Sequence, residues 1–113
     1  KVIYPGLEEH PGYEIMKKQA RGFGAMLTFE VRDKREVPVL LKAVRLIRFA
    51  ESLGGTESLL TYPITQTHAD VPPEVLAANG LTDRILRLSV GIENINDLRT
   101  DLEQAFAAVQ AAL

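Results

Sequence analysis

The chain has 113 residues, which suits one domain with one core, and its 13 basic and 15 acidic residues give a formal net charge of −2. Its 46% apolar and 25% charged residues are ordinary for a soluble globular protein. The sequence has no cysteine, no basic stripe interleaved with aromatic residues, no histidines at metal-ligand spacing and no long apolar run. We therefore expect a cytoplasmic protein without a disulfide, a metal site, a nucleic-acid partner or a membrane span.

The N-terminal stretch is rich in turns, which Pro5-Gly6 and Pro11-Gly12 indicate. The chain opens there at Lys1 and not at a methionine. We therefore expect a fragment of a larger protein, in which residues 1–12 are a linker from an absent upstream domain. Residues 13–20 mix apolar and basic side chains and predict a short helix.

Two strands and a helix are predicted in the middle of the chain. Residues 25–31 alternate between apolar and polar side chains, which is typical of a strand with one buried face. Residues 32–35 are charged and predict a solvated loop. Apolar residues recur at helical spacing over 36–47, which indicates an amphipathic helix. Beyond the turn at Gly54-Gly55, residues 58–62 predict a second strand.

The last third of the chain predicts a short helix, a strand and a long helix. The short helix covers 73–78 and ends at Asn79-Gly80, which favours a left-handed stop. The strand lies within 83–91, and Asn94 is the expected N-cap of the long helix. The apolar stripe of that helix comprises Ile95, Leu98, Leu102, Phe106, Val109 and Leu113. Short strands separated by helices predict a two-layer α/β sandwich, with one sheet and helices packed on one of its faces.

Arg87 is the first candidate for a functional side chain. Because Leu86 and Leu88 must face the helices, Arg87 and Ser89 point to the other face of the sheet. If that face meets water, the arginine needs no partner. If it meets a second domain, the half-buried guanidinium needs an anion, because an unpaired charge removed from water is costly. A carboxylate suits this role, since a guanidinium can bind it through two parallel hydrogen bonds.

The polar turn from Glu51 to Gly55 is the second candidate. Its glycines permit a positive φ and a close approach of the backbone to a ligand, and Glu51 could steer a proton. A Gly-Gly turn and a surface glutamate are also ordinary features. Thr67 and His68 offer hydrogen-bonding groups in an irregular loop, and Gly22-x-Gly24 is a weak indication of phosphate binding. With no Ser-His-Asp set, paired carboxylates or metal cluster, the chain resembles half of an active site.

Five blocks follow one another along nearly the whole chain. They are Tyr4-Pro5-Gly6-Leu7-Glu8-x-His10-Pro11, Gly22-Phe23-Gly24-x-Met26, Ala50-Glu51-Ser52-Leu53-Gly54-Gly55-x-Glu57-Ser58, Thr67-His68-Ala69 and Arg87-Leu88-Ser89-Val90-Gly91-Ile92-Glu93. In this order and spacing they resemble the C-terminal domain of the Cys/Met-metabolism family of pyridoxal-phosphate (PLP) enzymes. Its members include cystathionine γ-synthase, cystathionine β-lyase, cystathionine γ-lyase and methionine γ-lyase.

The resemblance implies the small C-terminal domain of a fold type I subunit over residues 1–113, with a mainly antiparallel sheet and helices on one side. It implies that Arg87 holds the α-carboxylate of an amino-acid substrate and that Ser52 and Thr67 support that pocket. Glu51 would face the side-chain end of the substrate. An acid there resembles the γ-synthases and γ-lyases, whereas the stretch 64–72 is similar to bacterial lyase members. Elimination and replacement, at Cβ or Cγ, therefore both stay open.

The resemblance places the Schiff-base lysine and the other PLP-binding residues in a large domain, and none of the five lysines here matches them. It therefore implies a chain that holds neither the cofactor nor a catalytic residue and is inactive alone. Its partners would be its own large domain and the substrate, within a homotetramer. A non-catalytic, amino-acid-binding regulatory module is the alternative that the composition leaves open.

Overall fold

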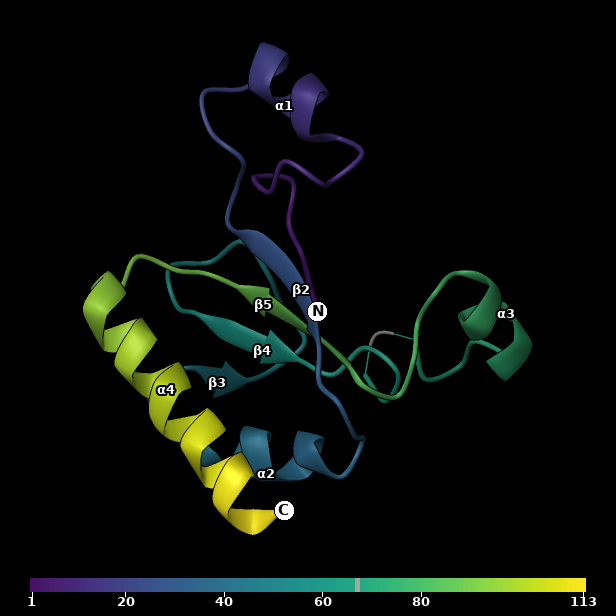
Figure 1. Ribbon diagram of the computed structural model, residues 1–113, viewed down its shortest axis with the longest axis vertical. Coiled ribbons are helices and arrows are strands. Elements are labelled where there is room, and N and C mark those ends of the chain that lie inside the picture. The colour runs from purple at the N-terminus through teal and green to yellow at the C-terminus, as the bar shows by residue number, and fades with distance from the viewer. Residues whose placement is uncertain (67) are drawn as a thin grey trace.

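The computed structural model describes residues 1–66 and 68–113. The strands are β1 (Val2–Ile3), β2 (Met26–Glu30), β3 (Arg48–Phe49), β4 (Leu59–Thr61) and β5 (Ile85–Ser89), and the helices are α1 (Tyr13–Gln19), α2 (Glu36–Ala43), α3 (Pro73–Ala78) and α4 (Ile95–Ala112). The strands form one sheet in the order β1-β2-β5-β4-β3 (Figure 1). Only the β3–β4 pair among these strands is parallel, so the predicted α/β fold with a mainly antiparallel sheet is confirmed.

The two longer helices, α2 and α4, pack against each other and against one face of the sheet. The shorter helices α1 and α3 extend away from the sheet (Figure 1). Helix α1 has no buried residue, and α3 buries only Leu76. The core cluster consists of Phe29, Val31, Val37, Leu40, Ile47, Leu60, Leu86, Leu88, Leu98, Ala105 and Val109. The predicted packing of helices on one face therefore holds for α2 and α4.

The central strand β5 separates an apolar face from a polar one. Its Leu86 and Leu88 pair in register with apolar residues of β2 and β4, and these side chains lie in the core under the helices. Arg87 pairs instead with Thr28 and Thr61 on the opposite face. Residues directly opposite one another on neighbouring strands share a face. The predicted orientation of Arg87, away from the helices, is thus confirmed.

Two short edge strands escaped the sequence analysis. Val2–Ile3 lies in the stretch predicted as a linker and pairs with β2, and Arg48–Phe49 pairs with β4. Strands of two residues are too short to show an alternating pattern. The helix predicted over 36–47 is also shorter, because it ends at Ala43 and Val44 is extended.

A buried carboxylate on α4 explains why α2 ends early. Asp101 is only 5% exposed and accepts hydrogen bonds from the backbone N–H groups of residues 45–47 at 2.8, 2.9 and 2.8 Å. Gln104 donates both to Asp101 at 3.0 Å and to the carbonyl of Ala43 at 2.6 Å. Burial raises the pKa of Asp101, but the hydrogen bonds outweigh it and hold the pKa below its ordinary value. A helical path over 45–47 would direct these amides elsewhere.

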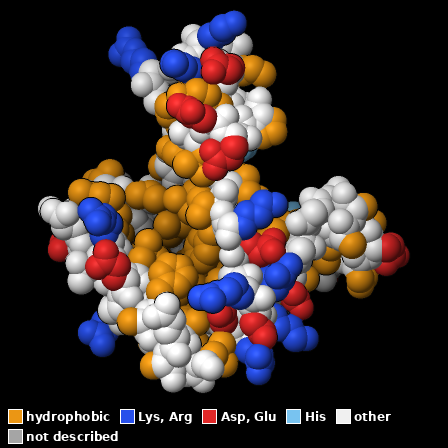
Figure 2. Space-filling model, in the orientation of Figure 1, with side chains coloured by type: hydrophobic (Ala, Val, Ile, Leu, Met, Phe, Trp, Pro, Cys, Tyr) orange, Lys and Arg blue, Asp and Glu red, His pale blue; other side chains and the backbone are white. Residues whose placement is uncertain are grey.

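An apolar hollow of about 500 Å³ lies between α4 and the β1–β2 edge of the sheet (Figure 2). Phe106 of α4 lines it and meets Phe29 edge-to-face, with ring centroids 6.0 Å apart. The predicted apolar stripe of α4 is therefore only partly buried. Leu98 and Val109 lie in the core, whereas Phe106 is 40% exposed.

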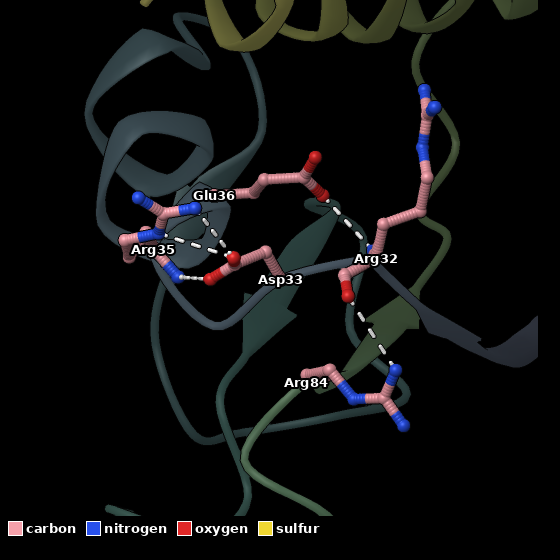
Figure 3. Close-up of polar contacts among 5 residues, drawn as sticks. All are labelled: Arg32, Asp33, Arg35, Glu36 and Arg84. Carbon is pink, nitrogen blue, oxygen red and sulfur yellow. Dashed lines mark hydrogen bonds and ion pairs between the residues drawn. The ribbon is translucent and has the colours of Figure 1, made fainter. Parts of the chain in front are cut away.

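The charged connection between β2 and α2 is solvated, as predicted. Asp33 accepts hydrogen bonds from the backbone and the side chain of Arg35, and Glu36 accepts one from the backbone N–H of Arg32 (Figure 3). The hydrogen bonds from Arg35 lower the pKa of Asp33 to about 2. An ion pair this exposed contributes little to stability.

We expect Asp101→Asn to lower the free energy of unfolding by about 3 kcal/mol, because an amide nitrogen cannot accept the backbone hydrogen bonds of a carboxylate oxygen. Urea unfolding at neutral pH measures the change. Glu103→Gln, on the exposed side of the same helix, is the matched control and should change stability by less than about 0.5 kcal/mol. Equal effects of the two substitutions would contradict the role of Asp101.

The same carboxylate predicts a dependence of stability on pH. Because its pKa is lower in the folded state, Asp101 stabilises the fold fully above the unfolded pKa of about 3.9. This contribution is lost as the pH falls through the folded pKa. The stability difference between wild type and Asp101→Asn should therefore be constant near neutrality and shrink below about pH 4. A difference that persists undiminished in acid would be inconsistent with a depressed pKa.

Candidate functional site

The guanidinium of Arg87 is half-buried and incompletely paired. Its Nη2 lies 3.4 Å from the Thr61 hydroxyl and 3.5 Å from the Glu51 carbonyl oxygen, and both contacts are long. Its Nε is buried and has no hydrogen-bond partner among the described residues. The ion pairs in that part of the chain join Asp33, Glu57 and Glu30 to other arginines, and none of them involves Arg87. A cation left in this state is suited to an external anion, because buried polar groups are normally satisfied.

Thr61 connects Arg87 to the segment that follows β3. Its fully buried hydroxyl donates to the carbonyl of Ala50 at 2.6 Å and accepts the contact from Arg87. The sequence analysis gave Thr61 no role, since its proximity to Arg87 follows only from the register of β4 on β5. The signal available in the sequence was a hydroxyl inside a short apolar strand.

Residues 50–58, which we call the glycine loop, pass beside Arg87. The structure brings Glu51 to Arg87 through its backbone carbonyl, while the side chains of Glu51 and Ser52 are exposed. Gly54 adopts φ +74°, so the expected left-handed backbone is present. Its N–H donates to the hydroxyl of Ser89 at 2.9 Å and is therefore already used within the protein.

The fourth predicted pocket residue, Thr67, lies outside the described residues, so its position relative to Arg87 stays a prediction. Its neighbour His68 is partly buried, and its backbone N–H donates to the carbonyl of Pro63 at 2.8 Å. The weak glycine motif near α1 does not form a cradle: Gly22 and Gly24 are exposed, and the Gly24 carbonyl accepts a hydrogen bond from Tyr4. Of the predicted pocket residues, the structure brings Glu51 to Arg87 through its backbone carbonyl, and Ser52 follows it in the chain with an exposed side chain.

A cluster of hydrogen bonds fastens the C-terminal end of the glycine loop. The carboxylate of Glu93 accepts from the N–H of Ser58 at 2.8 Å and from its hydroxyl at 2.7 Å. The same hydroxyl accepts from the N–H of Gly91 at 2.8 Å. These bonds from Ser58 lower the pKa of Glu93. In the sequence analysis Glu93 is only the last residue of the block that starts at Arg87, and it has no function there.

The site can bind and orient an anion, but its described side chains do not form a catalytic set. No group of three acids or histidines among those residues could hold a metal ion. All five lysines are exposed. None of the described helices is both long and apolar enough to cross a bilayer. The chemistry that remains is recognition of a carboxylate or a similar anion by Arg87.

Residues 1–107 match the family model described as "Cys/Met metabolism PLP-dependent enzyme". Cystathionine beta-lyase MetC of Bacillus subtilis is 49% identical over 109 residues, which is 96% of this chain and 28% of the relative. L-methionine gamma-lyase of Fusobacterium nucleatum is 47% identical over 110 residues, with the same coverage of both chains. Among solved structures, cystathionine gamma synthase from Xanthomonas oryzae pv. oryzae, in complex with cystathionine, has a TM-score of 0.95 and 42% identity, covering 100% of this chain and 30% of that one. The chain thus spans less than a third of the length of these relatives.

We expect Gly91→Ala to displace the glycine loop. A Cβ at this position would collide with the Thr56 carbonyl oxygen and lie 2.7 Å from both the Glu57 carbonyl carbon and Glu93 Oε1. The substitution should lower the free energy of unfolding by about 2 kcal/mol, measured in urea.

Gly55→Ala is the matched control within the same loop. Its Cβ would meet open space, and the backbone there lies outside the left-handed region. It should change stability by less than about 0.5 kcal/mol. If the two alanines have the same effect, the close contact at Gly91 does not constrain the loop.

Proposed function

Since the chain belongs to the Cys/Met metabolism family of PLP-dependent enzymes, we propose that it is the C-terminal domain that binds the substrate carboxylate in such an enzyme. The observation that carries this proposal is the half-buried guanidinium of Arg87, which has no carboxylate partner among the described residues. An amino acid supplies the missing anion through its α-carboxylate. Two parallel hydrogen bonds from a guanidinium fix both the position and the orientation of that group.

In this proposal, Glu51 and Ser52 at the start of the glycine loop, together with Thr67, would form the rest of the pocket. Ser52 and Thr67 support the carboxylate, and Glu51 faces the side-chain end of the substrate. The contact of Arg87 with the Glu51 carbonyl supports this arrangement, because it holds the loop beside the guanidinium. Orientation of a substrate by fixed groups can supply several kcal/mol of the reduction in barrier, provided that the geometry is close to ideal.

The described residues of this chain do not fit the role of a PLP site. A lysine that forms a Schiff base is typically desolvated so that its pKa falls, whereas Lys1, Lys17, Lys18, Lys34 and Lys42 are all exposed. We therefore propose that a large domain elsewhere in the complete protein binds PLP, and that this chain is inactive alone. Its own task is to bind and orient the substrate.

The reaction proposed for the complete enzyme is elimination or replacement at Cβ or Cγ of a sulfur amino acid. The relatives are named as cystathionine beta-lyases, an L-methionine gamma-lyase and a cystathionine gamma-synthase, which supports this class without selecting one member. Cystathionine is the first substrate to test, because the related synthase from Xanthomonas oryzae was solved in complex with it. A homotetramer and a cytoplasmic location stay predictions.

The complete protein allows a direct test of this function. Purified full-length protein should show the visible absorption band of bound PLP. It should also release a keto acid or a thiol from L-cystathionine or L-methionine. A colourless, cofactor-free protein that binds amino acids without converting them would contradict the proposal. That result would support the non-catalytic regulatory module instead.

In the full-length enzyme we expect Arg87→Ala to raise KM strongly and to lower kcat/KM by about a hundredfold or more, because the substrate loses its carboxylate partner. Arg87→Lys should recover only part of the loss, since an ammonium cannot form the two parallel bonds. Steady-state kinetics with the preferred substrate measure both variants.

Arg99→Ala, on the exposed side of α4, is the control for removal of a positive charge. It should leave both kinetic constants within about twofold of wild type, because surface changes away from the site have small effects. Near-normal kinetics of Arg87→Ala would remove Arg87 from the proposed role.

A further inference from the structure

We propose that Glu93 and Ser58 form a positioning clasp, which holds the glycine loop in place for binding of the substrate. The inference rests on the proposed function, since it concerns the same carboxylate pocket. Glu93 and Ser58 are not among the residues proposed to bind the substrate. They act instead on the loop that carries Glu51 and Ser52.

The glycine loop is tied at several points to one stretch of chain, β5 and the turn after it. Arg87 contacts the Glu51 carbonyl near the start of the loop. In the middle of the loop, the hydroxyl of Ser89 accepts a hydrogen bond from the N–H of Gly54. At the end of the loop, the carboxylate of Glu93 accepts hydrogen bonds from Ser58. The strand that supplies the guanidinium therefore also sets the position of the loop beside it.

The clasp provides the strongest of these ties. A carboxylate that accepts both a backbone N–H and a hydroxyl makes two charge-assisted bonds, which are shorter and stronger than bonds between neutral groups. Ser58 is fully buried, so its N–H and hydroxyl depend on Glu93 and Gly91 for partners. In the described part of the chain, Glu93 forms no ion pair with a basic residue. Its charge is therefore directed at the loop.

Hydrogen bonds, and not apolar packing, hold this loop. Residues 51–57 are all exposed, and Leu53 is 55% exposed. A segment with few buried apolar contacts opens locally at low cost unless hydrogen bonds restrain it. Loss of the clasp should therefore let Glu51 and Ser52 move relative to Arg87 while the core under Leu86 and Leu88 remains intact.

Glu93→Gln in the full-length, PLP-loaded enzyme tests the clasp, with Glu57→Gln as the matched control. Glu57 lies near the far end of the same loop, away from Glu51 and Ser52, and among the described residues its exposed carboxylate pairs only with Arg48, at 3.8 Å. We expect Glu93→Gln to raise KM for the preferred amino acid about tenfold and to change kcat less than about threefold, because it weakens binding in ground and transition states alike. Glu57→Gln should leave both constants close to wild type.

Hydrogen–deuterium exchange distinguishes positioning from a general loss of stability. Exchange in Glu93→Gln should rise in peptides covering 52–58 and stay unchanged in peptides of α2 and α4. Ser58→Ala should repeat the KM effect, which provides a second variant if Glu93→Gln does not fold. In the double variant the effects should not add, since both substitutions break the same contacts.

Two outcomes would overturn the clasp. One is a Glu93→Gln enzyme with the kinetics of Glu57→Gln. The other is an increase in hydrogen–deuterium exchange that spreads over α2 and α4, with kcat lowered and KM raised by similar factors. That result would indicate a purely structural role. If Arg87→Ala is severely impaired in the same assay, the carboxylate site stands and only the clasp fails. Normal kinetics of Arg87→Ala would mean that the proposed function itself is wrong.

Discussion

The alternation of side chains along β5 is the constraint on which this structure depends. Leu86 and Leu88 are almost completely buried beneath α2 and α4. A displacement of the strand by one residue would exchange its two faces, which would bury the guanidinium in the core and expose the leucines. Burial of the leucines therefore fixes Arg87 and Ser89 on the opposite face. The hydrophobic core and the proposed anion site are two consequences of one register.

Two kinds of interaction stabilise the fold. The helical face is a continuous apolar cluster, whose contribution scales with the area removed from water. Carboxylate groups, in contrast, organise the backbone of irregular segments, one beside this cluster at the end of α2 and one at the glycine loop. Asp101 binds three successive amides beyond α2, and Glu93 binds the end of the glycine loop. In both places a carboxylate from a later part of the chain satisfies backbone groups that helix or sheet leaves free.

Elements with a sustained pattern could be predicted from the sequence. The alternation in β5 gave the orientation of Arg87, and Asn94 does cap α4, since its side chain accepts from the N–H groups of Asn96 and Asp97. The early end of α2 could not be predicted, because Asp101 lies more than fifty residues further along the chain. The contact of Thr61 with Arg87 likewise depends on strand register, which no local pattern specifies. Local periodicity thus predicted the elements, and the long-range hydrogen bonds decided where they end.

Residue types in the sequence predicted candidates for the site, while the contacts around them could not be predicted. Arg87, Glu51 and Ser52 were candidates from the sequence, and the structure shows a contact of Arg87 with the Glu51 carbonyl, while the pocket itself stays a prediction. The roles of Thr61, Ser58 and Glu93 follow only from distances between segments about 30 residues apart. Their contacts are with the protein itself, so the chemistry of the ligand gave no reason to select them.

A crystal structure of the full-length enzyme with a bound amino-acid substrate tests the central claim most directly. The account predicts that both α-carboxylate oxygens lie about 2.8 Å from guanidinium nitrogens of Arg87, with the start of the glycine loop beside them. A substrate carboxylate held by a different cation, with Arg87 still in contact only with Thr61 and the Glu51 carbonyl, would contradict it.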